Sequence, residues 1–245
     1  MAEAFVTTSW DDGHPLDLRV AGLLEKHGLP GCFFVPRENP EREVMAEAAV
    51  RELSARFEIG GHALTHRPLT RMPRAEAVAE IHGCRAWLRD LTSTPVESFC
   101  YPGGYFDQGL VREVAKAGFT GARTADWMCL FPGSDPLRIA PTVQLHPHGA
   151  LVHLAHCLRR GHARPLLLWL TRLRRSTRPA QLVRGFIEVA RERGGVVHLW
   201  GHSWEVEEQG LWAELEDALW ALRDSGLVPI GSAELMRRVR DGRLR

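Results

Sequence analysis

Lysine is almost absent from this chain, and one long stretch has no acidic residue. Of the 31 basic residues, only Lys26 and Lys116 are lysines. Residues 139–187 contain no Asp or Glu, but eight arginines fall there: Arg159, Arg160, Arg164, Arg172, Arg174, Arg175, Arg178 and Arg184. The net charge is +1, so bulk charge points to no class of partner. We interpret residues 151–184 as a basic helical segment, either a solvated helix face or a short helix at a membrane surface.

Cysteine is scarce, and its spacing excludes a disulfide scaffold. The five cysteines are odd in number, widely spaced and without a CxxC pair, which favours free thiols. The chain also lacks an apolar run of membrane-spanning length and a basic-then-apolar leader at its N-terminus. We therefore expect a cytoplasmic location. Nucleic-acid binding is the weakest interpretation of the arginines, because no aromatic side chains are interleaved with them.

Short apolar runs alternate with helical patterns along the chain. The predicted strands are residues 4–9, 31–35, 57–61, 97–101, 119–123, 138–143, 196–200 and 227–230. The predicted helices are residues 15–27, 41–56, 74–91, 106–117, 181–193 and 212–225. Repeated strand–helix units imply a parallel sheet, and this number of units favours a closed or nearly closed β/α barrel.

Polar residues follow the predicted strands rather than precede them. Asp11 and Asp12 end the first strand, His62 the third, Tyr101 the fourth and His202 a late one. In a β/α barrel the carboxyl ends of the strands meet on one face, and that face carries the chemistry. Residues more than a hundred positions apart are therefore expected to form one site.

The first two clusters have the composition of a hydrolytic metal site. Two adjacent carboxylates at the end of a buried strand need a cation or a proton to offset their charge. His62 and His66 are four residues apart, which would place both imidazoles on one face of a helical turn. One Asp with two His is a recurring metal site with open positions for water and substrate. Taken singly, Asp-Asp-Gly is also a common turn, and the two histidines could simply begin a helix.

Further histidines need separate interpretations. His198 and His202 alternate along one strand, so both side chains point the same way. We favour His202, nearer the strand end, as a general acid and His198 as a hydrogen-bonded core histidine. A loose cluster follows the sixth predicted strand: His146, His148, His153, His156 and His162. Its mixed spacing favours surface or groove-lining residues over a second metal site.

These residues resemble the motifs of the polysaccharide deacetylase family, carbohydrate esterase family 4, with its NodB-homology domain. The first two motifs resemble Ser9-Trp10-Asp11-Asp12-Gly13 and His62-Ala63-Leu64-Thr65-His66. The third is similar to Cys100-Tyr101-Pro102-Gly103-Gly104, and the last to Trp200-Gly201-His202. The resemblance extends from about Thr7 to Glu205.

The resemblance implies a distorted (β/α)7-type barrel that forms a single domain over residues 1–245. It also implies one divalent metal ion and hydrolysis of N-acetyl groups on amino sugars. Zinc is the expected ion, with cobalt, nickel and manganese as alternatives. Six residues receive roles: Asp12, His62 and His66 as metal ligands, Asp11 as general base, the Tyr101 backbone N–H as a donor to the oxyanion, and His202 as general acid.

Two features depart from the family pattern. The third motif usually carries an Arg that braces the catalytic Asp, but Cys100 occupies that position. Asp126-Trp127 resembles the fourth motif, yet its Asp usually holds the missing Arg. Arg123 is a candidate replacement for that guanidinium. Arg123, Trp127 and Trp204 are also candidate substrate contacts.

The sequence thus predicts a metal-dependent hydrolase that removes an N-acetyl, or another small N-acyl, group from an amino sugar. Two alternatives stay open: a deformylase or deacylase acting on a lipid-carrier-linked amino sugar, and a non-catalytic carbohydrate-binding relative. The arginine-rich segment favours a phosphate-bearing substrate, because it would attract anions, and it leaves peripheral membrane contact open. The missing secretion signal points away from wall polymers. The sequence leaves the oligomeric state undetermined.

Overall fold

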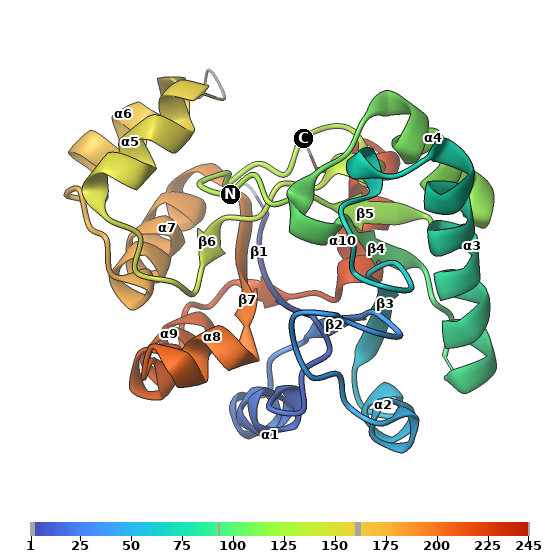
Figure 1. The fold of residues 1–245 in the computed structure, drawn as a ribbon. Coiled ribbons are helices and arrows are strands. Elements are labelled where there is room, and N and C mark those ends of the chain that lie inside the picture. The colour runs from blue at the N-terminus through green and yellow to red at the C-terminus, as the bar shows by residue number, and fades with distance from the viewer. Residues whose placement is uncertain (1–2, 93, 160–162, 245) are drawn as a thin grey trace.

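A curled, all-parallel sheet forms the centre of the protein (Figure 1). The computed structural model describes residues 3–92, 94–159 and 163–244. The strands are β1 (Ala4–Asp11), β2 (Cys32–Val35), β3 (Glu58–Gly61), β4 (Ser98–Cys100), β5 (Gly121–Arg123), β6 (Val143–Gln144), β7 (Gly195–His202) and β8 (Val228–Pro229). Seven of them follow the order β5-β4-β3-β2-β1-β7-β6, and β8 pairs with the first half of β1.

The segment before β6 brings the two edges of this sheet together. Ile139 forms a parallel bridge with Arg123 of β5, and its N–H donates to the Ala122 carbonyl (2.8 Å). Three residues later, the Thr142 N–H donates to the His198 carbonyl of β7 (3.0 Å). The predicted strand 138–143 is thus a bridge followed by the short β6. These contacts curl the sheet into the expected distorted (β/α)7-type barrel.

Helices surround the sheet and connect its strands. They are α1 (Asp17–His27), α2 (Glu47–Ser54), α3 (Arg74–Leu91), α4 (Gln108–Ala117), α5 (Ala150–Arg159), α6 (Ala163–Thr171), α7 (Pro179–Arg193), α8 (Ser203–Glu208), α9 (Trp212–Arg223) and α10 (Ser232–Arg240). Three short 3-10 turns are η1 (Leu69–Arg71), η2 (Pro102–Gly104) and η3 (Pro136–Arg138). The helix predicted from residue 41 begins only at Glu47, because the Met45 N–H donates instead to the Gly13 carbonyl (2.8 Å).

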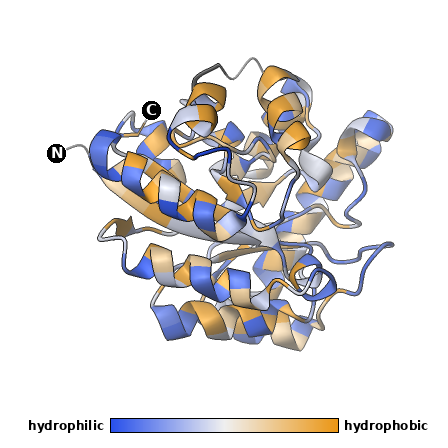
Figure 2. Cartoon of the chain, turned by 90° about the vertical axis from the view of Figure 1, so that its left-hand side faces the viewer, coloured by the Kyte–Doolittle hydropathy of each residue, from blue (hydrophilic) through white to orange (hydrophobic). Residues whose placement is uncertain are grey.

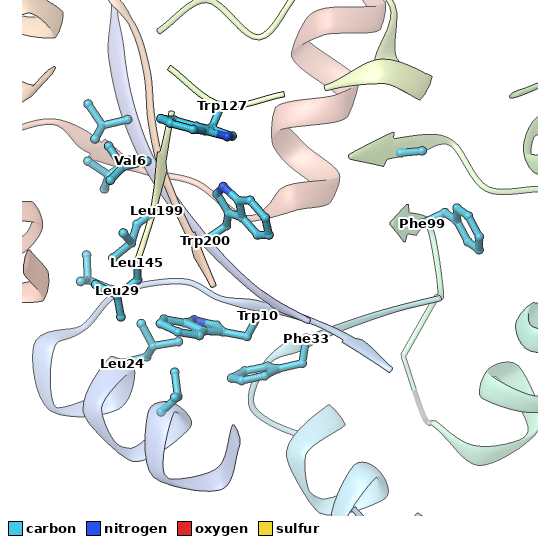
Figure 3. Close-up of a cluster of buried hydrophobic side chains, with 14 of the residues drawn as sticks. Val6, Trp10, Leu24, Leu29, Phe33, Phe99, Trp127, Leu145, Leu199 and Trp200 are labelled. Carbon is cyan, nitrogen blue, oxygen red and sulfur yellow. The ribbon is translucent and has the colours of Figure 1, made fainter. Parts of the chain in front are cut away.

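The central strand β1 is buried along almost its whole length. It pairs with β7 over all eight of its residues, from Ala4 opposite Gly195 to Asp11 opposite His202. Its own Trp10 lies in a core of large apolar side chains that includes Leu24 of α1 and Phe33 of β2 (Figure 3). This packing fixes where the end of β1 lies in the barrel, and hence the position of Asp11.

The charge around the basic segment, residues 151–184, is less uniformly positive in the structure than in the sequence. Arg172, Arg178 and Arg184 pair with carboxylates from other parts of the chain, which are Glu192, Glu214 and Asp217. Arg160 and His162 lie outside the described residues. Distant acids therefore offset part of the positive charge of this stretch, and its attraction for anions stays a prediction. None of the five cysteines is in a disulfide.

Candidate metal and catalytic site

A cavity of about 290 Å³ opens where the strands end. Its described lining includes five of the predicted side chains: Asp11, Asp12, His62, His66 and His202. They come from the ends of β1, β3 and β7, and the pairing of Asp11 with His202 places two of them side by side. None of the lining residues belongs to the segment 151–184.

Asp12 lies against both candidate imidazole ligands. Its Oδ1 is 3.0 Å from His66 Nε2 and 3.5 Å from His62 Nε2. The chain reaches this geometry through a turn in which Asp12 and Gly13 both have positive φ (78° and 61°). Glycine is needed at the second position, because a Cβ there would lie 2.7 Å from a Val35 methyl carbon.

The expected helical turn between His62 and His66 was wrong. The segment after β3 is irregular, with Ala63 and His66 in the left-handed region (φ 61° and 56°). Left-handed residues interrupt a helix. The two rings nevertheless converge, with centroids 4.8 Å apart. The spacing therefore identified the right pair of residues but not the backbone that joins them.

The polar atoms around Asp12 fit a divalent cation. His62 Nδ1 lies 2.8 Å from the Cys100 carbonyl and donates to it, so Nε2 is the ring nitrogen that faces Asp12. Asp12 Oδ1 is buried and receives no well-formed hydrogen bond. Burial alone would raise the pKa of Asp12, but the two adjacent imidazoles hold that pKa well below its usual range. A carboxylate oxygen facing two imidazole nitrogens is a ligand set typical of zinc.

Two sets of side chains in the described residues have the spacing to hold a metal ion. One is Asp12 with His62 and His66; the other is Asp11 with His62 and Cys100. The first set has fewer competing contacts, because the Asp11 carboxylate is already ion-paired with Arg123. We therefore regard Asp12, His62 and His66 as the candidate ligands.

Trp204 fixes the other oxygen of Asp12. Its indole Nε1–H donates to Asp12 Oδ2 (2.8 Å), which leaves Oδ1 facing the histidines. Trp204 belongs to α8, a short helix that the sequence patterns did not predict. The Arg42 guanidinium covers the indole ring at 4.0 Å. Trp204 thus orients a candidate ligand and also lines the cavity, where it was predicted to contact substrate.

Arg123 braces Asp11 from the neighbouring strand. Cys100 of β4 and Arg123 of β5 are register partners. The buried guanidinium reaches across that pair to contact Asp11 Oδ2 and, at 2.9 Å, Cys100 Sγ. Burial alone would raise the pKa of Asp11, but Arg123, with His62 and His202, lowers it below its usual value. Asp11 is therefore ionised, and its Oδ1 has no hydrogen-bond partner among the described residues.

Glu205 is a site residue that sequence reasoning missed. His202 Nε2 lies 4.0 Å from Asp11 Oδ2, and its Nδ1 lies 2.9 Å from Glu205 Oε2. His146 Nδ1 is 3.2 Å from the other oxygen of Glu205. Burial alone would lower the pKa of His202, but the Glu205 hydrogen bond and the Asp12 and Asp11 charges raise it. The spacing His-x-x-Glu across the start of a helix was the available signal.

Comparison with known proteins agrees with these motifs. The sequence profile of the family described as polysaccharide deacetylase matches residues 1–122. The chain belongs to the polysaccharide deacetylase family. A search of curated proteins found no match.

Solved structures of polysaccharide deacetylases have the same fold at low identity. A Mycobacterium smegmatis protein assigned to the polysaccharide deacetylases is 16% identical, with a TM-score of 0.69, and the alignment covers 100% of this chain and 92% of that one. The chitin deacetylase of Colletotrichum lindemuthianum is 14% identical (TM-score 0.61; 96% and 88% covered). The family 4 carbohydrate esterase PdaA of Bacillus subtilis is 15% identical (TM-score 0.56; 96% and 82% covered). At such identities these structures support the fold alone.

Three further candidate residues, Tyr101, Trp127 and Arg123, have contacts that bear on their predicted roles. The Tyr101 N–H, the predicted oxyanion donor, makes a long hydrogen bond to the Arg123 carbonyl (3.4 Å), so its role stays a prediction. Trp127 is buried and does not line the cavity, so the structure does not place it for the predicted substrate contact. Arg123 also lines the cavity, but its ion pair with Asp11 occupies it.

Three histidines of the loose cluster, His148, His153 and His156, surround Trp127. The rings of His148 and His156 each stack on the Trp127 ring, with centroid distances of 4.8 Å and 4.4 Å. His153 is buried beside them, and burial lowers its pKa to about 4. None of these appears in the potential metal groups of the described residues. His198 is hydrogen-bonded to Ser9 Oγ (2.8 Å) and buried, as predicted for a core histidine.

Proposed function

We propose that the protein is a metal-dependent deacetylase that hydrolyses the N-acetyl group of an amino sugar. The observation that carries this proposal is the meeting of three candidate ligands with a paired Asp11 and His202 in one cavity. Membership of the polysaccharide deacetylase family supports the hydrolase class. Zinc is our candidate for the ion, because the donors are one carboxylate and two imidazoles.

Each residue of the site can be given a role in amide hydrolysis. A divalent ion held by Asp12, His62 and His66 would lower the pKa of a water and polarise the acyl carbonyl. Asp11 would take the proton of the attacking water through Oδ1, since Arg123 already occupies Oδ2. The arginine keeps Asp11 ionised and therefore able to accept a proton.

His202 is placed to complete the reaction. Glu205 raises its pKa, which favours the imidazolium form needed to protonate a leaving nitrogen. Water contributes a hydroxyl to the acyl carbon, the C–N bond breaks, and the nitrogen leaves as an amine with the proton from His202. The products are acetate and a free amino sugar. A non-catalytic sugar-binding relative is disfavoured, because every residue this sequence of proton transfers requires is present.

Metal content tests the ligand assignment. We expect about one divalent ion per chain in the wild type and little in His66→Ala. His82→Ala is the matched control, because His82 lies half exposed in α3 and pairs with Glu113 outside the cavity. Equal metal content in all three proteins would refute the assignment. Acetate release from N-acetylglucosamine oligomers, with and without a chelator, then tests the activity itself.

A further inference from the structure

Helices α5 and α6 form a hairpin whose inner face is anchored to the barrel. Trp169 is buried, and its Nε1–H donates to the Ser176 carbonyl (2.8 Å). Its ring stacks on buried His153 at 5.2 Å. Cys157 and Leu173 are also buried. These contacts join α5 to α6, and the rings of His153 and His156 in turn lie against Trp127, outside the hairpin. This side of the hairpin therefore faces the rest of the protein, and the opposite side faces outward.

The outward side is apolar. The exposed fractions are 81% for Leu151, 48% for Val152, 63% for Leu158, 63% for Leu167 and 39% for Leu170. Hydrophobic colouring covers much of both helices, which are recognisable by the grey trace that joins them (Figure 2). Exposed apolar side chains scattered singly are ordinary, whereas five on two adjacent helices are more typical of an interaction site. We name these five residues the hairpin patch.

The charged residues next to the hairpin patch in the sequence are all arginines. No acidic residue occurs from 139 to 187. Arg172, Arg174 and Arg175 follow α6 directly and are exposed. Arg172 contacts Glu192, and exposed pairs of this kind are weak in water. An apolar surface with arginines at its base is complementary to a bilayer whose headgroups are negatively charged.

The hairpin is connected to the candidate catalytic residues through intermediate side chains. His146 contacts Glu205, the partner of His202. His148 and His156 then stack around Trp127, and His156 belongs to α5. A chain of direct contacts therefore connects the hairpin to the cavity. None of the helices in the described part of the chain has the length and apolarity to span a bilayer, so any association here would be peripheral.

We propose that the hairpin patch docks onto the surface of an anionic lipid bilayer. Docking would insert the five apolar side chains at the headgroup–acyl boundary, with the three arginines at the lipid phosphates. It would hold the cavity close to amino sugars carried on lipids. The inference concerns binding alone and does not depend on the proposed deacetylase activity.

Vesicle sedimentation tests the proposal directly. The full-length protein is mixed with vesicles of equal parts phosphatidylglycerol and phosphatidylcholine, or of phosphatidylcholine alone. We expect co-sedimentation with the anionic vesicles, weakened by 0.5 M salt because the charges are exposed. Absence of binding to either vesicle, or equal binding to both, would overturn the proposal.

Two sets of variants separate the apolar and basic contributions. Leu158→Asp with Leu167→Asp should lower vesicle affinity at least about 100-fold, because two inserted side chains are lost. Leu18→Asp with Val228→Asp, which replaces two exposed apolar residues elsewhere, is the matched control and should bind like the wild type. Unchanged binding by the hairpin variant, with its circular dichroism preserved, would contradict docking through this patch.

Replacing Arg172, Arg174 and Arg175 with Gln should lower anionic-vesicle affinity by about fivefold per charge. The control replaces the exposed Arg51, Arg89 and Arg240 with Gln. Equal loss in both triple variants would mean that net charge, not the hairpin, attracts the lipid. A dimer in solution that dissociates in Leu158→Asp with Leu167→Asp, without vesicle binding, would identify a second copy of the chain as the occupant. Asp11→Asn should bind vesicles normally, which keeps this test independent of catalysis.

Discussion

The most informative single change is Arg123→Met, which removes the guanidinium and keeps an unbranched, apolar side chain of similar length. Arg123 is buried against Asp11 and Cys100. Its loss removes the permanent positive charge that contacts this buried carboxylate. Breaking a buried pair in this way typically costs about 3–5 kcal/mol at neutral pH. For a chain of this length, that corresponds to a fall in Tm of about 6–20 °C.

The pH dependence of that loss distinguishes charge from packing. In the wild type the pKa of Asp11 is lowered on folding, so its pair contributes stability above the unfolded pKa and loses it as the pH falls through the folded one. In Arg123→Met only His62 and His202 still oppose the effect of burial, so the pKa of Asp11 should rise relative to the wild type. The variant therefore takes up a proton at mildly acidic pH. The Tm difference from the wild type should be largest at pH 7.5 and shrink towards pH 4.

Thermal unfolding of the chelator-treated proteins at both pH values measures this effect, and hydrolysis measures its catalytic consequence. The acid limb of kcat/KM reports the base, so it should move to higher pH in Arg123→Met. Arg123→Lys keeps the charge and should recover part of the stability. A Tm difference of the same size at pH 4 and pH 7.5 would refute the electrostatic reasoning and leave Arg123 a packing residue.

Strand register suggests that an arginine at position 100 can replace the guanidinium of Arg123. Cys100 lies opposite Arg123, within reach of Asp11 (Sγ to Oδ2 3.6 Å). Cys100→Arg combined with Arg123→Ala returns one guanidinium to the position that the family's third motif usually gives it. This double variant should be more stable at pH 7.5 than Arg123→Ala alone. If the added arginine lowers stability further, the two strand positions are not equivalent around Asp11.

Three further changes test the other residues. Asp11→Asn should keep the metal but lower turnover about 10²–10⁴-fold, as expected for loss of a base; near-normal hydrolysis would remove Asp11 from that role. Glu205→Gln should lower the pKa of His202, so the alkaline limb of the rate profile should move to lower pH, and an unmoved limb would contradict the pairing. Trp204→Phe removes the hydrogen bond to Asp12 and should weaken metal affinity about 10–100-fold, measured by competition with a chelator.

The sequence predicted the convergence of the site because convergence follows from topology. Parallel strands end on one side of the sheet, so residues that follow strands must meet there. That rule brought His62, 51 residues away in the sequence, and His202, 191 residues away, to Asp11. It required only the approximate ends of the strands. Their lengths were less important, since a shift of one or two residues at the start of a strand leaves its end unchanged.

Local geometry was predicted less well, for identifiable reasons. The helical turn predicted for His62 and His66 was wrong, because Ala63 and His66 adopt left-handed backbone conformations. The residue types alone do not predict such conformations. Glu205 was missed because α8 is only six residues long, too short for an apolar period. The basic segment seemed uncompensated because its acidic partners lie elsewhere in the chain.

Arg123 shows which part of a motif carries physical meaning. A comparison of motifs alone records Cys100 as a missing arginine and lowers the expectation of activity. In the structure the guanidinium is present, supplied by the register partner on the next strand. What Asp11 requires is a buried positive charge within contact distance, since that charge offsets its desolvation. Either strand can supply it, because paired residues on neighbouring parallel strands lie about 4.8 Å apart and an arginine side chain is longer than that. The requirement therefore belongs to a position in space that two places in the sequence can fill.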